Sequence, residues 1–334
     1  MNQKTLWPLS AAVIALFVPP VFAEQETSPL TVVDTMEKNF GVHPGQRRNH
    51  TKGVCAEGSF MATREAAILS RSPIFSGKAI PVIARFSVAG GRPNIPDTAR
   101  NPRGMALGFM LPDGSKHLMA MLHTPLFGVA TPAAFLENLQ AATPDPATGK
   151  PDPEKQKAFA AGHPEAKAQG EFLKATNPPA SYASTPYYSL HAFRFINAAN
   201  QGRYVRWDFQ PQDGTSYIET SALASTPADF LEARLQDRIG KGPVKWDMLV
   251  TLAEPGDTLT DPTVAWPTER KRIRVGTLEL SKSSTQAGGS CEKINFDPMV
   301  MSDGVEPSDD PVLRFRSAAY AVSFGRRLSD PVGK

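Results

Sequence analysis

The C-terminal part of the chain places an arginine and a tyrosine four residues apart, at Arg316 and Tyr320. On a helix, two residues at this spacing lie on the same face. A guanidinium group beside a phenol stabilises the phenolate form, and a phenolate is one of the few protein groups that bind haem iron. The same spacing is common in proteins, so the alternative is a buried tyrosine with an incidental arginine neighbour.

Two further segments carry side chains that move protons or bind anions. The first, RRNHTKG, contains Arg47 and His50. An imidazole can act as a general acid or base, although a single histidine more often has a structural role. The second, RFSVAGG, contains Arg85 and Ser87 and precedes DTARNPRGMA at residues 97–106. By itself this second segment indicates a strand, a loop and another strand.

A largely β structure is expected to position these residues. Alternating apolar and polar residues, clearest at 203–209 and 272–280, predict half-buried strands. The Pro-Asp-Gly-Ser turn at 112–115 predicts a hairpin. Eight strands, with most helices inserted late, favour an α+β fold: one eight-stranded antiparallel β-barrel with surrounding helices. The predicted strands are 52–62, 79–88, 104–112, 115–122, 188–196, 203–210, 245–253 and 270–281.

The clearest predicted helix is 227–239. Thr226 can cap it, Pro227 suits its first turn, apolar residues recur on one face, and Gly240 ends it. Residues 142–186, rich in Pro, Ala, Gly and Lys, are expected to form a long excursion over the surface. Weaker helical patterns cover 31–40, 132–141, 154–174 and 311–325.

Together, these segments resemble the monofunctional haem catalase family in order and spacing. The His50 segment resembles the family's distal histidine motif, and RFSVAGG with DTARNPRGMA resembles the strand and loop that follow it. HTPLF at 123–127 resembles the family's Asn-Thr-Pro-x-Phe. VGTLEL and NFDPMVMSDGVEPSDD resemble the segments before the proximal helix, and RFRSAAYAVSFGRR resembles that helix. The resemblance covers nearly the whole chain after about residue 30 and implies a minimal, exported catalase-related peroxidase.

The resemblance also implies roles for single residues. Tyr320 falls on the proximal iron ligand and Arg316 on the arginine that stabilises its phenolate. His50 falls on the distal acid–base residue, and Ser87 on the serine that orients it. The implied cofactor is haem b with its iron, since the chain has no C-x-x-C-H attachment site. Further cofactor-binding residues are three arginines expected to pair with the haem propionates and two aromatic pocket residues: Arg47, Arg85, Arg327, Phe127 and Phe135. For Phe135, ordinary core packing is the alternative.

The resemblance has two departures inside the expected pocket. Catalases carry a distal asparagine that helps to bind peroxide, whereas the ungapped match places Leu122 there. A leucine cannot donate a hydrogen bond; a one-residue bulge would bring His123 into the pocket instead. Asn49 stands where catalases usually have an apolar residue, and we expect it to face the barrel wall, the alternative being a polar contribution to the pocket.

The expected function is reduction of hydrogen peroxide or organic peroxides with small organic electron donors, in defence against oxidative stress, with weak catalase activity. Two alternatives remain open: an allene oxide synthase-like hydroperoxide isomerase and a non-enzymatic haem-binding protein. The net charge of +3 and the absence of a long Lys/Arg run disfavour nucleic acid as a partner. The match to the family stops near Arg327, so we expect a monomer or a small homo-oligomer rather than an interlocked tetramer.

The N-terminus predicts export. Lys4 precedes an apolar run that ends in Val-Phe-Ala, which indicates a signal peptide at residues 1–23, with a membrane anchor as the alternative. The expected mature protein is a single catalase-like haem peroxidase domain at 24–334, periplasmic or secreted, with no stable membrane anchor after cleavage. Export permits a disulfide between Cys55 and Cys291, but the sequence leaves open whether it forms.

Overall fold

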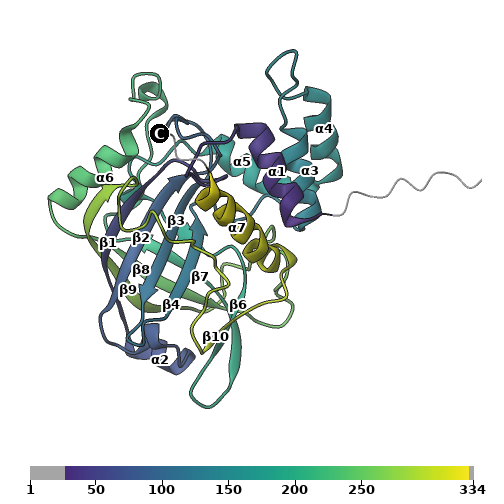
Figure 1. The fold of residues 1–334 in the computed structure, drawn as a ribbon. Helices are drawn as coiled ribbons and strands as arrows, with labels where there is room; N and C mark the ends of the chain where they lie inside the picture. Colours follow the sequence, from purple (N-terminus) through teal and green to yellow (C-terminus); the bar gives the residue numbers. More distant parts are fainter. Residues whose placement is uncertain (1–26, 331–334) are drawn as a thin grey trace, which may run out of the picture.

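The computed structural model describes residues 27–330, so the predicted signal peptide at 1–23 lies outside the described residues. Within them, antiparallel strands form one sheet in the order β10-β6-β7-β5-β4-β3-β2-β1-β9-β8. A further pairing of β7 with β8 closes eight of these strands into the predicted barrel (Figure 1). The strands are β1 Gly53–Ala62, β2 Ile80–Val88, β3 Arg103–Met110, β4 Lys116–Leu122, β5 Tyr187–Tyr188, β6 Phe193–Ile196, β7 Gly202–Pro211, β8 Val244–Leu252, β9 Arg272–Thr285 and β10 Val305–Pro307.

The strand predictions differ from the structure mainly at 188–196. This segment forms two short strands, β5 and β6, because Leu190 between them adopts a left-handed conformation with φ 66°. Strand β10, which pairs with β6, was not predicted. The predicted hairpin is confirmed: Gly114 has φ 83°, and Asp113 accepts the backbone N–H of Ser115 at 2.9 Å, so β3 turns directly into β4.

Large aromatic side chains fill the barrel interior. Phe60 and Phe109 meet edge to face, with ring centroids 5.5 Å apart. Phe86 and Trp246 pack in the same core cluster. Gly276 on β9 leaves room for Phe60, because a Cβ at this position would lie 2.2 Å from the ring. Such rings each bury roughly 150–250 Å², so the interior is a packed core.

The helices lie outside this barrel. Figure 1 shows α7 crossing the outer face of the barrel, close to α1. Helix α1 contacts both α7 and α3, and these three helices cover the outer face of β2, β3 and β4. The helices are α1 Pro29–Phe40, α2 Arg64–Leu69, α3 Pro132–Ala141, α4 Pro153–Gly162, α5 Lys167–Ala175, α6 Phe230–Gly240 and α7 Pro311–Ser329, with short 3-10 turns at Pro73–Phe75, Pro164–Ala166, Tyr182–Ser184 and Thr220–Ala222.

Two helix predictions need correction. Helix α6 begins after Asp229, so the predicted start at residue 227 is wrong: the Thr226 hydroxyl donates to the Ala222 carbonyl at 2.8 Å instead of capping the helix. Gly240 is the last residue of that helix rather than the residue after it. The predicted helix 154–174 is divided into α4 and α5 by a turn that follows His163, and α2 was not predicted. None of the helices within residues 27–330 is both long and apolar enough to cross a bilayer.

The two cysteines of the chain are bonded to each other. Cys55 on β1 and Cys291, in the segment before α7, form a disulfide with Cα atoms 5.3 Å apart. Both residues are fully buried against Leu118 and Phe296. The bond therefore attaches the segment that leads into α7 to the outer face of the barrel.

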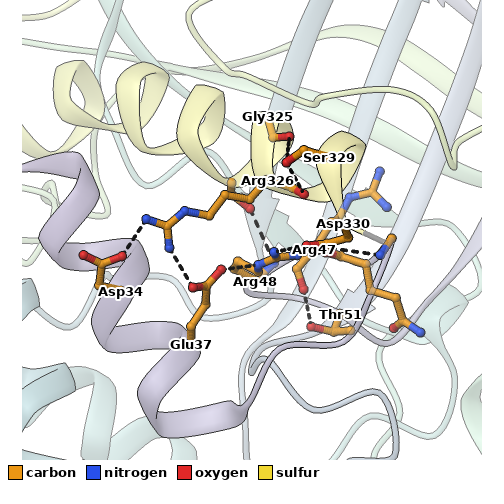
Figure 2. A network of polar contacts seen from close by, with 12 residues as sticks. Asp34, Glu37, Arg47, Arg48, Thr51, Gly325, Arg326, Ser329 and Asp330 are labelled. Carbon is orange, nitrogen blue, oxygen red and sulfur yellow. Dashed lines mark hydrogen bonds and ion pairs between the residues drawn. The ribbon is translucent and has the colours of Figure 1, made fainter. Parts of the chain in front are cut away.

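A network of ion pairs, buried at Arg48 and exposed at Asp34, connects the loop before β1 to two helices (Figure 2). Arg48 donates to both carboxylate oxygens of Asp330, at 2.7 Å each, and to Glu37 at 2.6 Å. Glu37 also accepts from Arg326 at 2.7 Å, and Arg326 binds Asp34 at 2.5 Å. We call these five residues the strap. Because they belong to the loop, α1 and the end of α7, the strap fixes the three segments relative to one another.

The disulfide is expected to contribute substantially to stability, because it closes a loop over a sequence separation of 236 residues. Replacing both cysteines by alanine should lower the free energy of unfolding by about 2–5 kcal/mol. Urea denaturation of the wild type and the double variant measures this difference. Dithiothreitol should destabilise only the wild type, and equal midpoints for the two proteins would contradict the expectation.

Stability should also depend on pH through Asp330. Hydrogen bonds from Arg48 hold the pKa of Asp330 below its ordinary value of 3.8. A depressed carboxyl pKa gives stability that is fully present above the ordinary value and is lost as pH falls through the folded value. Asp330→Asn should therefore lower the free energy of unfolding by about 1–3 kcal/mol at pH 7.

The stability of the wild type should approach that of Asp330→Asn as the pH falls through the lowered pKa of Asp330. Asp309→Asn is the matched control, since the Asp309–Arg314 pair is exposed and should contribute less than about 1 kcal/mol. Chemical denaturation across pH tests both variants; a stability difference for Asp330→Asn that does not change with pH would contradict the role given to its carboxylate.

Candidate active site

A cavity of about 410 Å³ lies between the outer face of β2–β4 and the helices α1, α3 and α7. The chain segments that reach it include the loop before β1 and the segment that precedes α7. All nine residues predicted from the sequence line it, namely Arg47, His50, Arg85, Ser87, Phe127, Phe135, Arg316, Tyr320 and Arg327. The fold thus brings together residues from both ends of the chain.

Helix α7 supplies the phenol. Asp310 caps the helix by accepting the N–H groups of Val312 and Leu313, and Pro311 occupies its first turn. Six residues on, Arg316 donates from Nη2 to the Tyr320 hydroxyl at 2.9 Å. The predicted pairing on one helix face is confirmed, and both side chains face the cavity.

Sequence analysis missed a histidine behind this pair. His191 lines the cavity, and its Nδ1–H donates to Asp310 at 2.7 Å. Burial lowers the pKa of His191, and the bond to Asp310 opposes that shift without cancelling it. The cap of α7 is therefore held by an imidazole from the β5–β6 connection. No local pattern could reveal a contact between residues 119 positions apart.

On the other side of the cavity, His50 is fixed by strand β2. Its Nδ1 hydrogen-bonds to Ser87 Oγ at 2.9 Å, and no residue between 27 and 330 forms a hydrogen bond with Nε2. His50 itself has φ 53°, an uncommon left-handed conformation. Gly104 on β3 makes room for the pair, because a Cβ there would lie 2.7 Å from Ser87 Oγ and 3.2 Å from the imidazole.

His50 is uncharged at neutral pH. Burial lowers its pKa to about 3, and the nearby positive charges of Arg85, Arg316 and Arg47 act in the same direction. A neutral imidazole with one nitrogen held by a serine and the other available can accept a proton from a bound ligand.

Three arginines give the cavity a strongly positive edge. Arg47 donates to the carbonyls of Cys291, Glu292 and Ile294 at 2.8–3.2 Å. Arg85 donates to the His50 carbonyl at 2.5 Å, and Arg327 stacks over Phe324 at 4.7 Å. These contacts hold the guanidinium groups in place without neutralising their charge.

Burial lowers the pKa of Arg47 to about 8, with repulsion from Arg85 and Arg327 adding to the effect. Burial likewise lowers the pKa of Arg85 to about 10 and lowers that of Arg327. Within residues 27–330 no carboxylate forms an ion pair with these three arginines. The cavity edge is therefore suited to a ligand that carries carboxylates.

The remaining walls suit a flat apolar ligand. Gly104, Ala106 and Ala120 are neighbours in the register of β3 and β4, and they leave this part of the wall without bulky side chains. Phe127 and Phe135 stack with ring centroids 6.1 Å apart at the same cavity. Haem needs a flat apolar wall for its porphyrin, cations for its carboxylates and a ligand for its iron. The cavity offers all three, so the residues present fit this cofactor.

The two departures noted in the sequence both lie at this cavity. Strands β3 and β4 pair in regular register up to Leu122, so no bulge is present and Leu122 lines the cavity. His123 points elsewhere and accepts the backbone N–H of Arg103 at 3.0 Å. Asn49 also lines the cavity, so the expectation that it faces the barrel wall is wrong. Its carbonyl oxygen does bind the loop after β2, by accepting the N–H of Gly90.

Curated relatives match almost the whole chain. A "Catalase-related peroxidase" of Synechococcus elongatus is 56% identical over 306 residues, which are 92% of this chain and 90% of that protein. A protein of the same name from Mycolicibacterium paratuberculosis is 37% identical over 301 residues, which are 90% of this chain and 95% of that protein.

Solved catalases share the fold. A fungal catalase superposes with a TM-score of 0.77 and 25% identity, covering 85% of this chain and 59% of that one. Catalase A from Saccharomyces cerevisiae gives 0.77 and 26% identity, covering 85% of this chain and 61% of that one. The chain thus spans about three fifths of the length of these two enzymes. A family model described as Catalase matches residues 32–331, and with this match, the relatives and the barrel in agreement, the chain belongs to the catalase family.

Proposed function

We propose that the chain is a haem-dependent peroxidase that reduces hydrogen peroxide or organic peroxides with small organic electron donors and has weak catalase activity. The observation that carries this proposal is the pairing of Arg316 with Tyr320 and of His50 with Ser87 at one cavity. A protein that only carried haem would need no uncharged, serine-oriented imidazole there. The relatives described above are named as peroxidases and catalases, and they give no support to the hydroperoxide isomerase alternative.

In this proposal Tyr320 would bind the haem iron, and Arg316, which donates to its hydroxyl at 2.9 Å, would stabilise the phenolate. Arg47, Arg85 and Arg327 would hold the two propionates, whose charge would relieve the mutual repulsion of the arginines. Phe127 and Phe135 would pack against the porphyrin. The cofactor is haem b, bound without a covalent link, because the sequence has no C-x-x-C-H motif.

His50 carries the proton chemistry. With Nδ1–H donating to Ser87, Nε2 would accept the proton of one peroxide oxygen. His50 would then return this proton to the other oxygen, which leaves as water or as an alcohol when the O–O bond breaks. Haem, when bound, supplies the electrons that this cleavage consumes. Because burial lowers the pKa of His50 to about 3, the imidazole is uncharged throughout the neutral range and Nε2 carries a free lone pair.

Leu122 accounts for the expected weak catalase activity. Catalase turnover needs a second peroxide to bind as a two-electron donor. Leu122 presents an apolar side chain to the cavity from β4 and offers this peroxide no hydrogen bond. Electrons are then returned by organic donors.

We further propose that the protein works outside the cytoplasm, in the periplasm or after secretion, as a monomer or small homo-oligomer. The signal-like residues 1–23 support export. The buried Cys55–Cys291 disulfide supports an oxidising compartment.

The proposal predicts that Tyr320→Phe, purified from haem-supplemented cells, loses most of its haem or shows an altered ferric spectrum. Phenylalanine keeps the ring but removes the oxygen that would bind iron. Absorption spectroscopy and haem content measure the change. Wild-type haem content, spectrum and turnover in this variant would refute the assignment of Tyr320.

His50→Ala is the matched variant on the other side of the cavity. It should keep its haem but lose about 10²–10⁴-fold in kcat/KM for peroxide, since general acid–base catalysis supplies a factor of this size. Peroxidase turnover with an organic donor such as o-dianisidine measures the loss. Unchanged turnover would contradict the role of His50.

A further inference from the structure

Asn49 precedes His50 in the chain and lines the same cavity. Its Oδ1 accepts two backbone N–H groups, from His50 at 2.8 Å and from Gly90 at 2.9 Å. Both partners can only donate, so the atom between them has to be the amide oxygen. The orientation of the carboxamide is therefore fixed by its neighbours, and Nδ2 points away from these two N–H groups.

The Nδ2 group of Asn49 has no hydrogen-bond acceptor within residues 27–330, although both bonds of its oxygen are made. This Nδ2 atom is not fully enclosed by protein. Because Asn49 lines the cavity and its Oδ1 is taken up by two backbone N–H groups, Nδ2 is the polar atom of this side chain that is left for a ligand there. A donor anchored through its own oxygen at two points needs little reorganisation to bind a ligand.

The other side-chain amides at the cavity are less suited to this task. Gln169 already donates to Thr124 Oγ1 at 3.1 Å and to the Leu126 carbonyl at 2.9 Å. Asn138 is exposed on α3, and Asn295 belongs to the segment that leads into α7, far from His50 in the chain. Asn49 is thus the amide donor adjacent to the imidazole.

We propose that Asn49 is a catalytic residue whose Nδ2 donates a hydrogen bond to the peroxide while His50 accepts the peroxide's proton. The inference rests on the proposed function and deepens it by identifying a second group that binds the substrate. As the proton moves to His50 Nε2, the peroxide oxygens become more negative, and a fixed N–H donor stabilises that charge. When His50 returns the proton, the other oxygen leaves as water, with the two electrons for O–O cleavage supplied by the bound haem, and the donor is again free.

Asn49 also helps to position His50, and an experiment must separate this role from hydrogen-bond donation to the peroxide. Its oxygen holds the backbone N–H of His50, whose φ is 53°. A variant that loses the whole carboxamide therefore affects both the donor and the histidine. Ser87→Ala affects the orientation of His50 but leaves Asn49 untouched, so it is the matched control.

The test measures the dissociation constant of fluoride for the ferric holoprotein, a binding equilibrium that involves no turnover. Fluoride is a small anion that only accepts hydrogen bonds. Asn49→Val should weaken fluoride binding about tenfold, which corresponds to losing one hydrogen bond to an anion. Ser87→Ala should have a clearly smaller effect, because it keeps the donor.

An Asn49→Val variant with wild-type affinity, or with an effect no larger than that of Ser87→Ala, would overturn the role of Asn49 as a donor. If Asn49→Val fails to retain haem, Asn49→Asp replaces it, since a carboxylate keeps both backbone contacts but has no N–H. Wild-type fluoride affinity in Asn49→Asp would equally overturn the inference. A wild-type protein that binds neither haem nor fluoride would instead refute the proposed function itself.

Discussion

The site depends on one geometric constraint: a phenol and an imidazole from opposite ends of the chain have to face the same narrow cavity. Neither group reaches the other directly, so their separation is set by what holds each of them. Tyr320 lies on α7, whose first turn is capped by Asp310 and, through it, by His191. His50 is held by Ser87 on β2. The barrel joins the two supports, and its tightly packed aromatic interior makes that connection stiff.

The same cavity carries an electrostatic cost. Two buried arginines, Arg85 and Arg327, lie near the half-buried Arg47, and the lowered pKa values of Arg47 and Arg85 reflect the cost of burying their charge. The disulfide and the strap lie immediately beside the arginines. Cys291 supplies one of the carbonyls that Arg47 binds, and Arg48 and Arg326 are the chain neighbours of Arg47 and Arg327. Stabilising contacts are thus concentrated beside these positive charges, a common compromise at functional sites.

Much of this could be predicted from the sequence because the relevant signals are local. Period-two alternation located most strands, and the i,i+4 spacing placed Arg316 beside Tyr320. The resemblance to catalases then located His50 and the arginines, which no periodicity identifies. Features that depend on tertiary contacts were missed. The left-handed Leu190 divides an otherwise uniform strand pattern, and Asp310 meets His191 only after the sheet has formed. The disulfide could not be decided either, because distance between Cα atoms is a property of the fold.

The RRNH segment shows why a loop can position a catalytic group as accurately as a strand. Its four side chains are held by different parts of the molecule: Arg47 by carbonyls before α7, Arg48 by the strap, Asn49 by Gly90, and His50 by Ser87. Four independent anchors in four residues leave the backbone few alternative conformations, which explains how His50 can be kept at φ 53°. The polar residues at positions 48 and 49 therefore have separate roles. Arg48 secures the loop through its contacts with Asp330 and Glu37, whereas Asn49 lines the cavity next to the imidazole that would act on a bound peroxide.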